Sequence, residues 1–323
     1  MKAAVVTETG VRVMDVPVPK PGPDEVLVRV RAAGMNRADL GVAAGKAHGA
    51  MGGAGTIIGL EFAGEVVEFG EAVHGLKVGD RIMASGSGGY AEYAVAHRGR
   101  IVPIPDVNMG WEEAATLPVA LQTMHDAVVT NGRLQPGEAV MIQGASSGVG
   151  LMGLQIAKMK GARLVIGTST NPARRARLPE FGADLALDTS APDWPEQVLK
   201  ATDGQGVELI VDQVSASVAN GNMKAAAVLG RIVNVGRLGG TRGEFNFDLH
   251  ALKRISYIGV TFRTRTPEEV AEIVARARAD LGEAVASRKL RLPLDRSFAL
   301  DEAVEALAYM EANRHFGKIV LTT

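Results

Sequence analysis

The sequence predicts an α/β protein made of a β-rich unit and a doubly wound parallel sheet. Short stretches that favour strands, separated by glycine-rich turns, fill residues 1–120. Strands and helices then alternate from Met124 to Thr261, which is typical of a parallel sheet covered by helices. An apolar strand also runs into a turn of small residues at positions 144–150. The length of 323 residues is enough for two domains.

In the β-rich unit, β-favouring residues bounded by turn residues mark the strands. Residues 41–55, rich in Gly and Ala, predict a mobile surface loop. Glu112 and Glu113 suit the start of a short helix at 111–115. The expected strands are residues 2–6, 11–16, 25–33, 62–69, 81–84 and 90–96.

The turn at 144–150 is the most informative segment. It follows the apolar strand that begins at Val140 and precedes a helix over residues 151–160. Small residues let backbone N–H groups and a helix N-terminus approach a dinucleotide pyrophosphate, as in a Rossmann fold. Two registers fit the glycine pattern, one starting at Gly148 and one using Ala145, Ser147 and Gly150, and we favour the second because Gly153 then lies inside the helix. The predicted contacts are Gly144, Ala145, Ser146, Ser147, Gly148, Val149 and Gly150.

The alternation continues to residue 261. Highly apolar strands such as residues 207–211 suit a parallel sheet with both faces covered. Residues 236–255 look more like a loop than a helix. Further strands are expected at 163–167, 184–187, 231–235 and 256–261, and helices at 172–181, 193–202 and 215–229.

Two helices, 267–281 and 300–313, and a last strand, 317–321, follow the sheet and are expected to complete the first domain. The predicted domains are residues 1–123 with 263–323, and a Rossmann dinucleotide-binding domain at 124–262.

Composition excludes several classes of protein. A net charge of −1 without a basic run argues against nucleic-acid binding. No apolar run approaches the ~20 residues of a membrane span, and the first residues do not form a secretory signal, so we expect a cytoplasmic protein. With no cysteine, thiolate-bound zinc and disulfides are impossible. The six histidines are scattered, and no metal is expected, although a site of distant His and carboxylates stays open.

Several motifs resemble the medium-chain dehydrogenase/reductase superfamily, in its zinc-free quinone oxidoreductase branch. The matching segments, in family order, are residues 32–40, 59–67, 78–82, 88–93, 144–150 and 317–321. The resemblance implies a GroES-like catalytic domain beside the Rossmann domain, and often a homodimer. Zinc-dependent members have a cysteine at the position of Asn36 and a histidine at that of Leu60, and neither residue here can hold zinc.

The predicted cofactor is NADP. No carboxylate ends the strand at 163–167, where NAD-dependent proteins bind the ribose 2′-hydroxyl. Thr168 and Ser169 follow this strand, and Arg174 lies where related quinone reductases place a lysine against the 2′-phosphate. The alternative is that Arg174 belongs to a solvated helix face with Arg175 and Arg177. Relatives also often have a tyrosine where this chain has Thr189.

The resemblance places Asn36 near the nicotinamide as a catalytic and cofactor contact, although it is equally suited to cap a turn before Asp39. Thr123 lies at the position of a threonine that contacts the cofactor in relatives, and the alternative is that it caps a helix. Gly236 is expected to contact the cofactor through its backbone. The tyrosine proposed as an acid in relatives is replaced by Gly41, so His48 is a candidate substitute, as is Lys46 in the same loop. His125 is either a functional residue or one that only fills the interface between the domains. Asp39 and Glu61 lie at motif positions that zinc enzymes also retain, which suggests structural roles.

Without a metal, conjugated acceptors are easier to reduce than isolated ketones, because charge delocalises as hydride arrives. The sequence therefore predicts an NADPH-dependent reductase of a quinone or an α,β-unsaturated carbonyl compound. An enoyl-thioester reductase and an NADPH-binding protein of low activity remain alternatives. A homodimer through the edge strand from Ser256 to Thr261 is expected.

Overall fold

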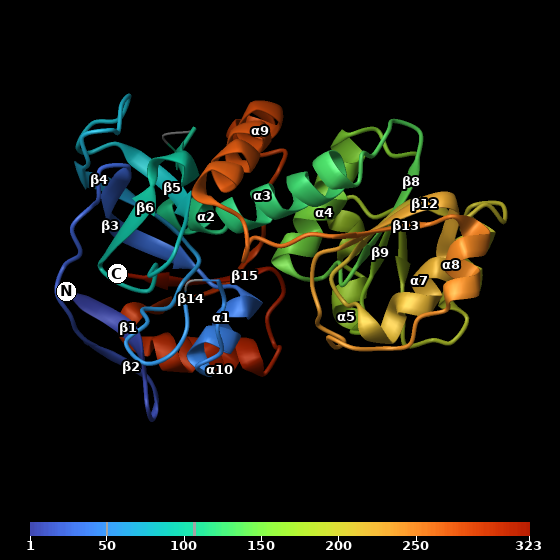
Figure 1. Cartoon of the computed structure of the whole chain (residues 1–323), viewed down its shortest axis with the longest axis horizontal. Coiled ribbons are helices and arrows are strands. Elements are labelled where there is room, and N and C mark those ends of the chain that lie inside the picture. The colour runs from blue at the N-terminus through green and yellow to red at the C-terminus, as the bar shows by residue number, and fades with distance from the viewer. Residues whose placement is uncertain (50, 106–107) are drawn as a thin grey trace. The chain divides into compact units, whose positions relative to one another are not determined.

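The computed structural model describes residues 1–49, 51–105 and 108–323 in two compact units (Figure 1). Unit 1 comprises Met1–Gln122 and Phe262–Thr323, and unit 2 comprises Thr123–Thr261. Residue 50 of the expected loop at 41–55 lies outside the described residues. Each unit has its own sheet and its own buried apolar core.

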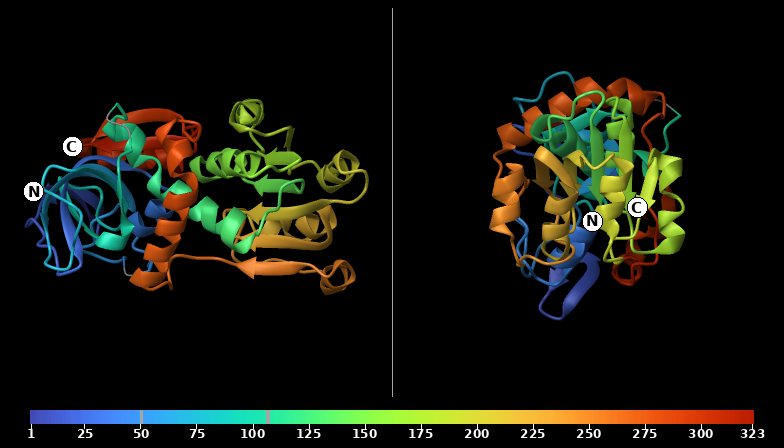
Figure 2. Two further views of the ribbon diagram at one scale, coloured as in Figure 1. Left: turned by 90° about the horizontal axis from the view of Figure 1, so that it is seen from above. Right: turned by 90° about the vertical axis from the view of Figure 1, so that its right-hand side faces the viewer.

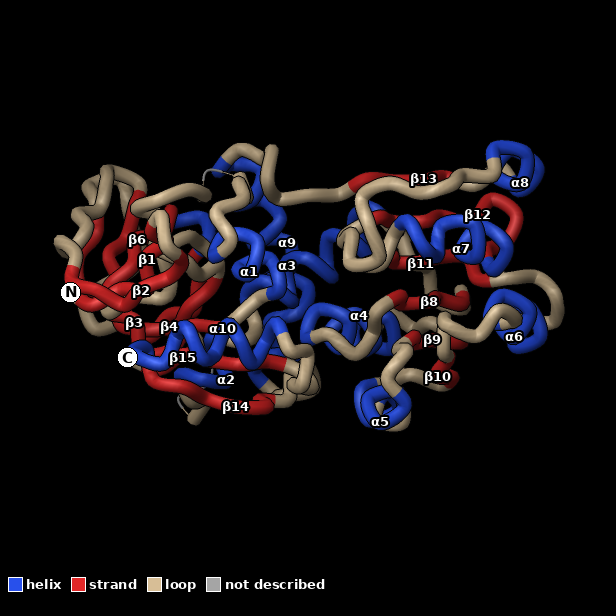
Figure 3. Tube along the Cα trace, turned by 90° about the horizontal axis from the view of Figure 1, so that it is seen from below, coloured by secondary structure: helices blue, strands red, loops and turns tan. Residues whose placement is uncertain are grey.

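Unit 2 contains a six-stranded sheet in the order β10-β9-β8-β11-β12-β13, in which every neighbouring pair is parallel. Figure 3 shows these strands side by side in that order. The order in which the strands are added to the sheet reverses between β8 and β11, the place where ligands bind in doubly wound sheets. The strands are β8 (Ala139–Gln143), β9 (Leu164–Thr168), β10 (Leu185–Leu187), β11 (Val207–Asp212), β12 (Ala226–Asn234) and β13 (Ser256–Gly259).

Helices cover both faces of this sheet, because successive residues of a strand point to opposite sides. Met141 and Ile210 share a buried cluster with Trp194 of α6 and Met223 of α7. On the other face, α4 lies close enough that a Cβ on its Gly153 would be 3.5 Å from the side chain of Ile142. The helices are α4 (Gly148–Met159), α5 (Pro172–Arg175), α6 (Trp194–Ala201), α7 (Ala219–Ala225) and α8 (Phe247–Lys253).

Unit 1 is built on a seven-stranded, mostly antiparallel sheet in the order β14-β15-β3-β4-β5-β7, with β6 paired to β3. Its core includes Val28, Phe62, Ile82 and Tyr90. The hairpin of β1 (Lys2–Thr7) and β2 (Gly10–Asp15) is dark blue at the bottom of the right-hand view in Figure 2. The sheet strands are β3 (Glu25–Gly34), β4 (Glu61–Phe69), β5 (Arg81–Ser85), β6 (Tyr93–His97), β7 (Ile101–Pro103), β14 (Leu294–Ala299) and β15 (Lys318–Thr322).

Unit 1 also carries helices around its sheet. The longest, α9, begins at Pro267 after a capping box in which Thr266 and Glu269 bond each other's backbone. Helix α3 begins in unit 1 and continues beyond Gln122 into a π-helical turn. The helices are α1 (Arg37–Ala43), α2 (Trp111–Ala115), α3 (Pro118–His125), α9 (Pro267–Ala286) and α10 (Ala303–Glu311).

Several expected elements differ from the structure. The predicted helix 215–229 ends at Ala225, because Ala226 already pairs with Val207 in the sheet. The predicted loop 236–255 contains α8, too short for its periodicity to be recognised. Helix α5 ends at Arg175, and a short 3-10 helix begins at Leu178, so 172–181 is not one helix. Pro179, in the first turn of the 3-10 helix, has no N–H with which to continue the hydrogen bonds of α5.

The strand expected at 90–96 begins only at Tyr93. The first residues of the expected loop at 41–55 belong to α1. No helix among the described residues is long and apolar enough to cross a membrane.

Candidate functional site

The turn after β8 has the geometry of a dinucleotide-binding loop. Gly144 has a φ of +68°, which a residue with a side chain rarely adopts. A Cβ on Gly150 would lie 2.7 Å from both Ala145 Cα and Gly144 O. Ser147 caps α4, because its Oγ accepts a hydrogen bond of 3.0 Å from Gly150 N–H. Glycines therefore let the helix start press directly against the turn.

This arrangement leaves donors for an anion. The backbone N–H groups of Gly148 and Val149 lie in the first turn of α4, where a helix offers them no backbone acceptor. Such groups and the positive end of the helix dipole bind phosphate. Gly153 lies in the second turn of α4, so a glycine register that starts at Gly148 lies wholly within the helix. The residues present fit a dinucleotide pyrophosphate.

The end of β9 is tied to this turn. Thr168 donates from Oγ1 to Gln143 Oε1 (2.7 Å) and accepts from Gly144 N–H (3.0 Å), so its hydroxyl is fully used inside the protein. Ser169 Oγ lies 3.0 Å from Ser146 Oγ. The structure thus brings the predicted residues Ser146 and Ser169 together beside the phosphate-binding turn, whereas Thr168 has a structural role through its side chain.

The arginines after β9 have different surroundings. Arg175 donates to Ser169 O (2.9 Å) and pairs with Asp188 at 2.8 Å. Hydrogen bonds from Ser190, together with Arg175, lower the pKa of Asp188. Arg174 is half-buried in the first turn of α5, and its backbone N–H donates to Asn171 Oδ1, which caps the helix (3.0 Å). Arg175 therefore neutralises the acid on the neighbouring strand and holds the Ser169 loop beside Arg174.

The sequence did not reveal a set of polar residues at the ends of β8 and β11. Gln213 donates to Gln143 O (3.0 Å) and accepts from Ser147 Oγ (3.1 Å). The buried carboxylate of Asp212 accepts from Ser215 N–H (2.9 Å), and burial raises its pKa. Ser215 Oγ in turn donates to the carbonyl of Gly236 at 2.5 Å. In the sequence, only the position of these residues at the ends of apolar strands could have indicated them. The bond from Ser215 places Gly236 at the same edge of the sheet.

Thr123, the first residue of unit 2, lies inside α3 rather than at either end of it. In the part of the chain that the structure describes, its hydroxyl has no hydrogen-bond partner. The capping alternative therefore does not hold, and the hydroxyl can bind a ligand. His125 ends the same helix and is buried.

In unit 1, Asn36 belongs to a buried polar cluster. Its Nδ2 donates to Glu61 Oε1 (2.9 Å), and its Oδ1 accepts from Lys318 Nζ (3.0 Å). Lys318 also donates to Met35 O (2.7 Å) and to Glu61. Glu61 and Lys318 are 0% and 3% exposed. We call Asn36, Glu61 and Lys318 the lysine cluster.

A second buried acid adjoins this cluster. Asp39 Oδ2 accepts from Asn36 N–H and from Tyr90 Oη, both at 2.7 Å. Burial raises the pKa of Asp39 from 3.8 to about 7, against the opposing effect of these hydrogen bonds and of Lys318. Asp39 and Glu61 thus hold Asn36 in place, in agreement with the structural roles expected for them.

The candidate acids His48 and Lys46 lie in the expected 41–55 loop and are not part of the lysine cluster. His48 is half-buried, and burial and the charge of Arg263 lower its pKa. Its backbone pairs with Met51. Lys46 is exposed. Gly41, at the position of the family tyrosine, is in α1, and a Cβ there would meet nothing within 4 Å.

The donor set at Asn36 does not fit a zinc ion. Leu60 offers no ligand, and the ammonium of Lys318 already neutralises Glu61. A divalent cation here would be repelled by that ammonium. Among the described residues, no group of three His, Cys, Asp or Glu side chains is arranged to hold a metal.

Comparisons with known proteins cover both units. Residues 22–106 match the family model of the alcohol dehydrogenase GroES-like domain, and residues 148–278 match that of zinc-binding dehydrogenases. A quinone oxidoreductase of Pseudomonas syringae pv. tomato is 26% identical, with full coverage of both chains and a TM-score of 0.88. The chain belongs to the medium-chain dehydrogenase/reductase superfamily. The expected fold, a GroES-like domain with a Rossmann domain, is confirmed.

Other proteins similar to this chain have different activities. The mycobacterial protein Rv1454c, solved in complex with NADPH, is 26% identical, with full coverage of both chains and a TM-score of 0.89. CurK enoyl reductase is 25% identical over 99% of each chain, with a TM-score of 0.86. A phenolphthiocerol/phthiocerol polyketide synthase subunit of Mycobacterium tuberculosis is 32% identical over 94% of this chain. The chain spans 14% of the length of that relative.

Proposed function

We propose that this oxidoreductase is a zinc-independent, NADPH-dependent reductase of quinones or α,β-unsaturated carbonyl compounds. The lysine cluster is the observation that carries the proposal. Zinc-dependent relatives have a zinc-binding cysteine at the position of Asn36. Here the ammonium of Lys318 lies beside Asn36 and pairs with the carboxylate of Glu61. An isolated ketone needs an electrophile that this cluster does not supply, whereas a conjugated acceptor spreads the developing charge.

The cofactor is NADP(H), and the residues that would hold it lie at one edge of the unit 2 sheet. Gly148 and Val149 offer backbone N–H groups to the pyrophosphate. Ser169 and Arg174 are the groups for the 2′-phosphate, since a guanidinium binds phosphate in a bidentate manner. When bound, reduced nicotinamide supplies a hydride to the acceptor. A solved relative in complex with NADPH supports this assignment.

The lysine cluster limits what Asn36 can do. Its Nδ2 is directed at Glu61 and, at 3.4 Å, at Gly34 O. Its Oδ1 has one lone pair beyond that used by Lys318, so we propose that Asn36 accepts a hydrogen bond from the cofactor or substrate. The unbonded hydroxyl of Thr123 is a second contact.

The proton for the acceptor is proposed to come from solvent. The family tyrosine is replaced by Gly41, and the donors of Asn36 and Lys318 are used inside the cluster. The lowered pKa of His48 favours the neutral ring at pH 7, which makes it a poor acid. A His48→Gln variant should therefore retain the rate of the wild type.

The test is the initial rate of NADPH and NADH oxidation with quinones, cyclic enones, alkenals and a crotonyl thioester. Turnover with NADPH and a quinone or enone is expected. The best alternative is an enoyl-thioester reductase, favoured by the likeness to CurK enoyl reductase and to a polyketide synthase. A preference for the thioester would replace the proposal with that alternative. Tight NADPH binding without turnover would indicate a binding protein of low activity.

We also propose a cytoplasmic homodimer formed through β13, the edge strand of the unit 2 sheet. Large apolar side chains next to this edge support it. Phe247 and Leu252 of α8 are 76% and 73% exposed, and α8 packs on β12, the neighbour of β13. Light scattering should give twice the mass of 33.8 kDa, and a monomeric mass would contradict this proposal.

A further inference from the structure

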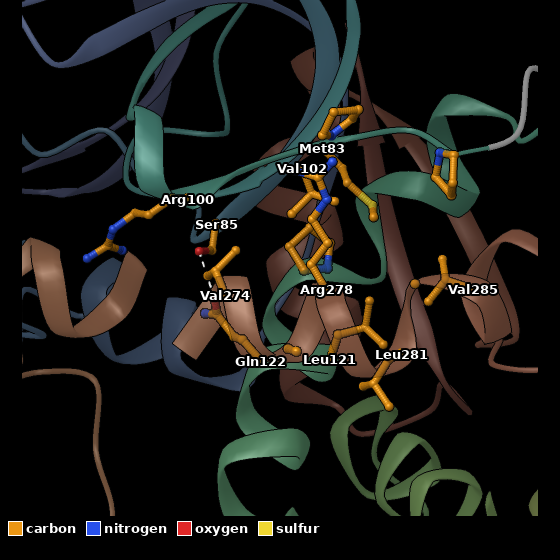
Figure 4. A pocket seen from close by; sticks show the side chains of 15 residues that line it. Met83, Ser85, Arg100, Val102, Leu121, Gln122, Val274, Arg278, Leu281 and Val285 are labelled. Atoms are coloured by element: carbon orange, nitrogen blue, oxygen red, sulfur yellow. Dashed lines mark hydrogen bonds between the residues drawn. The ribbon is translucent and has the colours of Figure 1, made fainter. Parts of the chain in front are cut away.

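A second candidate site lies wholly within unit 1. A cavity of about 250 Å³ is enclosed by β5 and β7, the first turns of α3, and α9 (Figure 4). Its walls are mainly apolar. The apolar lining includes Met83, Val102, Leu121, Val274, Ala277 and Val285. Four of the described lining residues are polar.

The polar lining residues are not distributed evenly. Figure 4 shows Arg100 at one end of the cavity, beside Ser85, and Val285 at the opposite end. Ser85 Oγ donates to Gln122 Oε1 at 2.9 Å, and these two side chains are 2% and 6% exposed. In the described parts of the chain, Gln122 Nε2 has no acceptor. The amide group of Gln122 therefore has donors that a ligand in the cavity can use.

Arg100 is the most unusual member of this lining. The side chain is half-buried, and burial alone lowers the pKa of its guanidinium. No ion pair or hydrogen bond of this guanidinium occurs within the described ranges. Arg278, exposed on α9, lines the same cavity, and none of the described lining residues is acidic. Among the described residues, this positive charge therefore has no counter-ion.

We propose that this cavity binds a small carboxylate with an apolar body, whose carboxylate lies against Arg100 and Gln122 Nε2. A guanidinium binds a carboxylate through two parallel hydrogen bonds. The apolar walls then bury the hydrocarbon part of the ligand, which is favourable by ~25 cal/mol for each Å² removed from water. None of its described lining residues belongs to the dinucleotide loop or to the lysine cluster.

The volume sets the size of the ligand. At ~30 Å³ for each water-sized group, a cavity of about 250 Å³ holds roughly eight non-hydrogen atoms. Hexanoate has that size and supplies one carboxylate and a flexible chain. Hexanamide has the same shape without the charge. These two compounds are the matched probes.

Isothermal titration calorimetry of the full chain with hexanoate tests the proposal. Saturable binding of one hexanoate for each chain is expected, with hexanamide at least about tenfold weaker, because a charge-assisted pair is lost. An Arg100→Gln variant should weaken hexanoate at least about tenfold in the same way. Arg98→Gln is the control, because Arg98 is in the same turn, is exposed and pairs with Asp24 at 2.9 Å.

Two further measurements separate binding from a structural role. The ligand-free Arg100→Gln protein should melt at or above the wild-type temperature, because it no longer buries an unpaired charge. Ala277→Phe should fill the cavity and abolish hexanoate binding while Arg100 remains. Absence of hexanoate binding at millimolar concentration, equal binding by Arg100→Gln, or a marked fall in its melting temperature would overturn the proposal.

Discussion

Replacing Lys318 with methionine tests whether the lysine cluster holds unit 1 together. The substitution keeps most of the hydrocarbon but removes the ammonium that bonds Met35 O, Asn36 Oδ1 and Glu61. Glu61 is then a carboxylate with no exposed surface and no cation. Breaking a buried pair in this way costs about 3–5 kcal/mol. In a unit of this size, that loss lowers the melting temperature by roughly 6–20 °C.

The two tryptophans make the effect assignable to one unit. Trp111 belongs to unit 1 and Trp194 to unit 2. In a Trp194→Phe background, fluorescence therefore follows the unfolding of unit 1 alone. Urea unfolding at pH 7 then gives the change in the free energy of unfolding.

Two controls sharpen this prediction. Lys2→Met breaks an exposed pair with Asp301, whose side chains are 51% and 62% exposed, and should leave the melting temperature unchanged. Combining Lys318→Met with Glu61→Gln should recover part of the lost stability, because both charges are then absent. A melting temperature of Lys318→Met within about 2 °C of wild type, under 1 kcal/mol, would refute the reasoning, as would a double variant no more stable than the single one.

Other variants test the cofactor site and the acid beside the cluster. Arg174→Ala should raise the dissociation constant of NADPH at least about tenfold but not that of NADH; the control is Arg177→Ala, and an unchanged preference between the cofactors would contradict the assignment. The stability of Asp39→Asn relative to wild type should rise as pH rises from 3.8 to about 7. The gain is about 1.4 kcal/mol for each pH unit, because the raised pKa of Asp39 makes folding of the wild type favour the protonated acid. Parallel profiles of stability against pH for the two proteins would refute this prediction. Gly150→Ala should weaken NADPH binding and cost about 1–3 kcal/mol, because its Cβ overlaps the turn backbone. Gly41→Ala, in helix α1 where that space is open, should leave NADPH binding unchanged in calorimetry and should not lower the melting temperature.

The sequence was sufficient to predict most of unit 2. Its strands are continuous apolar runs, and the turn at Gly144 is a local motif, so short-range information defines both. Where the prediction of helix 215–229 was wrong, the run from Ala226 to Leu229 has the composition of either a helix or a strand. Pairing with β11 decides between them, and that pairing is not encoded locally.

The lysine cluster was not predictable for the same reason. Asn36 and Glu61 were singled out from motifs, but nothing near Lys318 indicated that its ammonium would reach them across 257 residues. The polar residues Gln143 and Gln213 also lie far apart in sequence. Their positions follow only once β8 and β11 are neighbours in the sheet.

The origin of unit 1 in two separated segments has a consequence for its synthesis. Unit 2 is continuous and is complete once residue 261 has emerged, whereas β3 obtains its partner β15 only from the last residues of the chain. At ~5–20 residues per second, Glu61 waits roughly 10–50 s on the ribosome before Lys318 is made. During that time unit 1 has an open strand edge and an uncompensated acid. An open strand edge can pair with another chain, so β3 is exposed to aggregation until β15 has emerged.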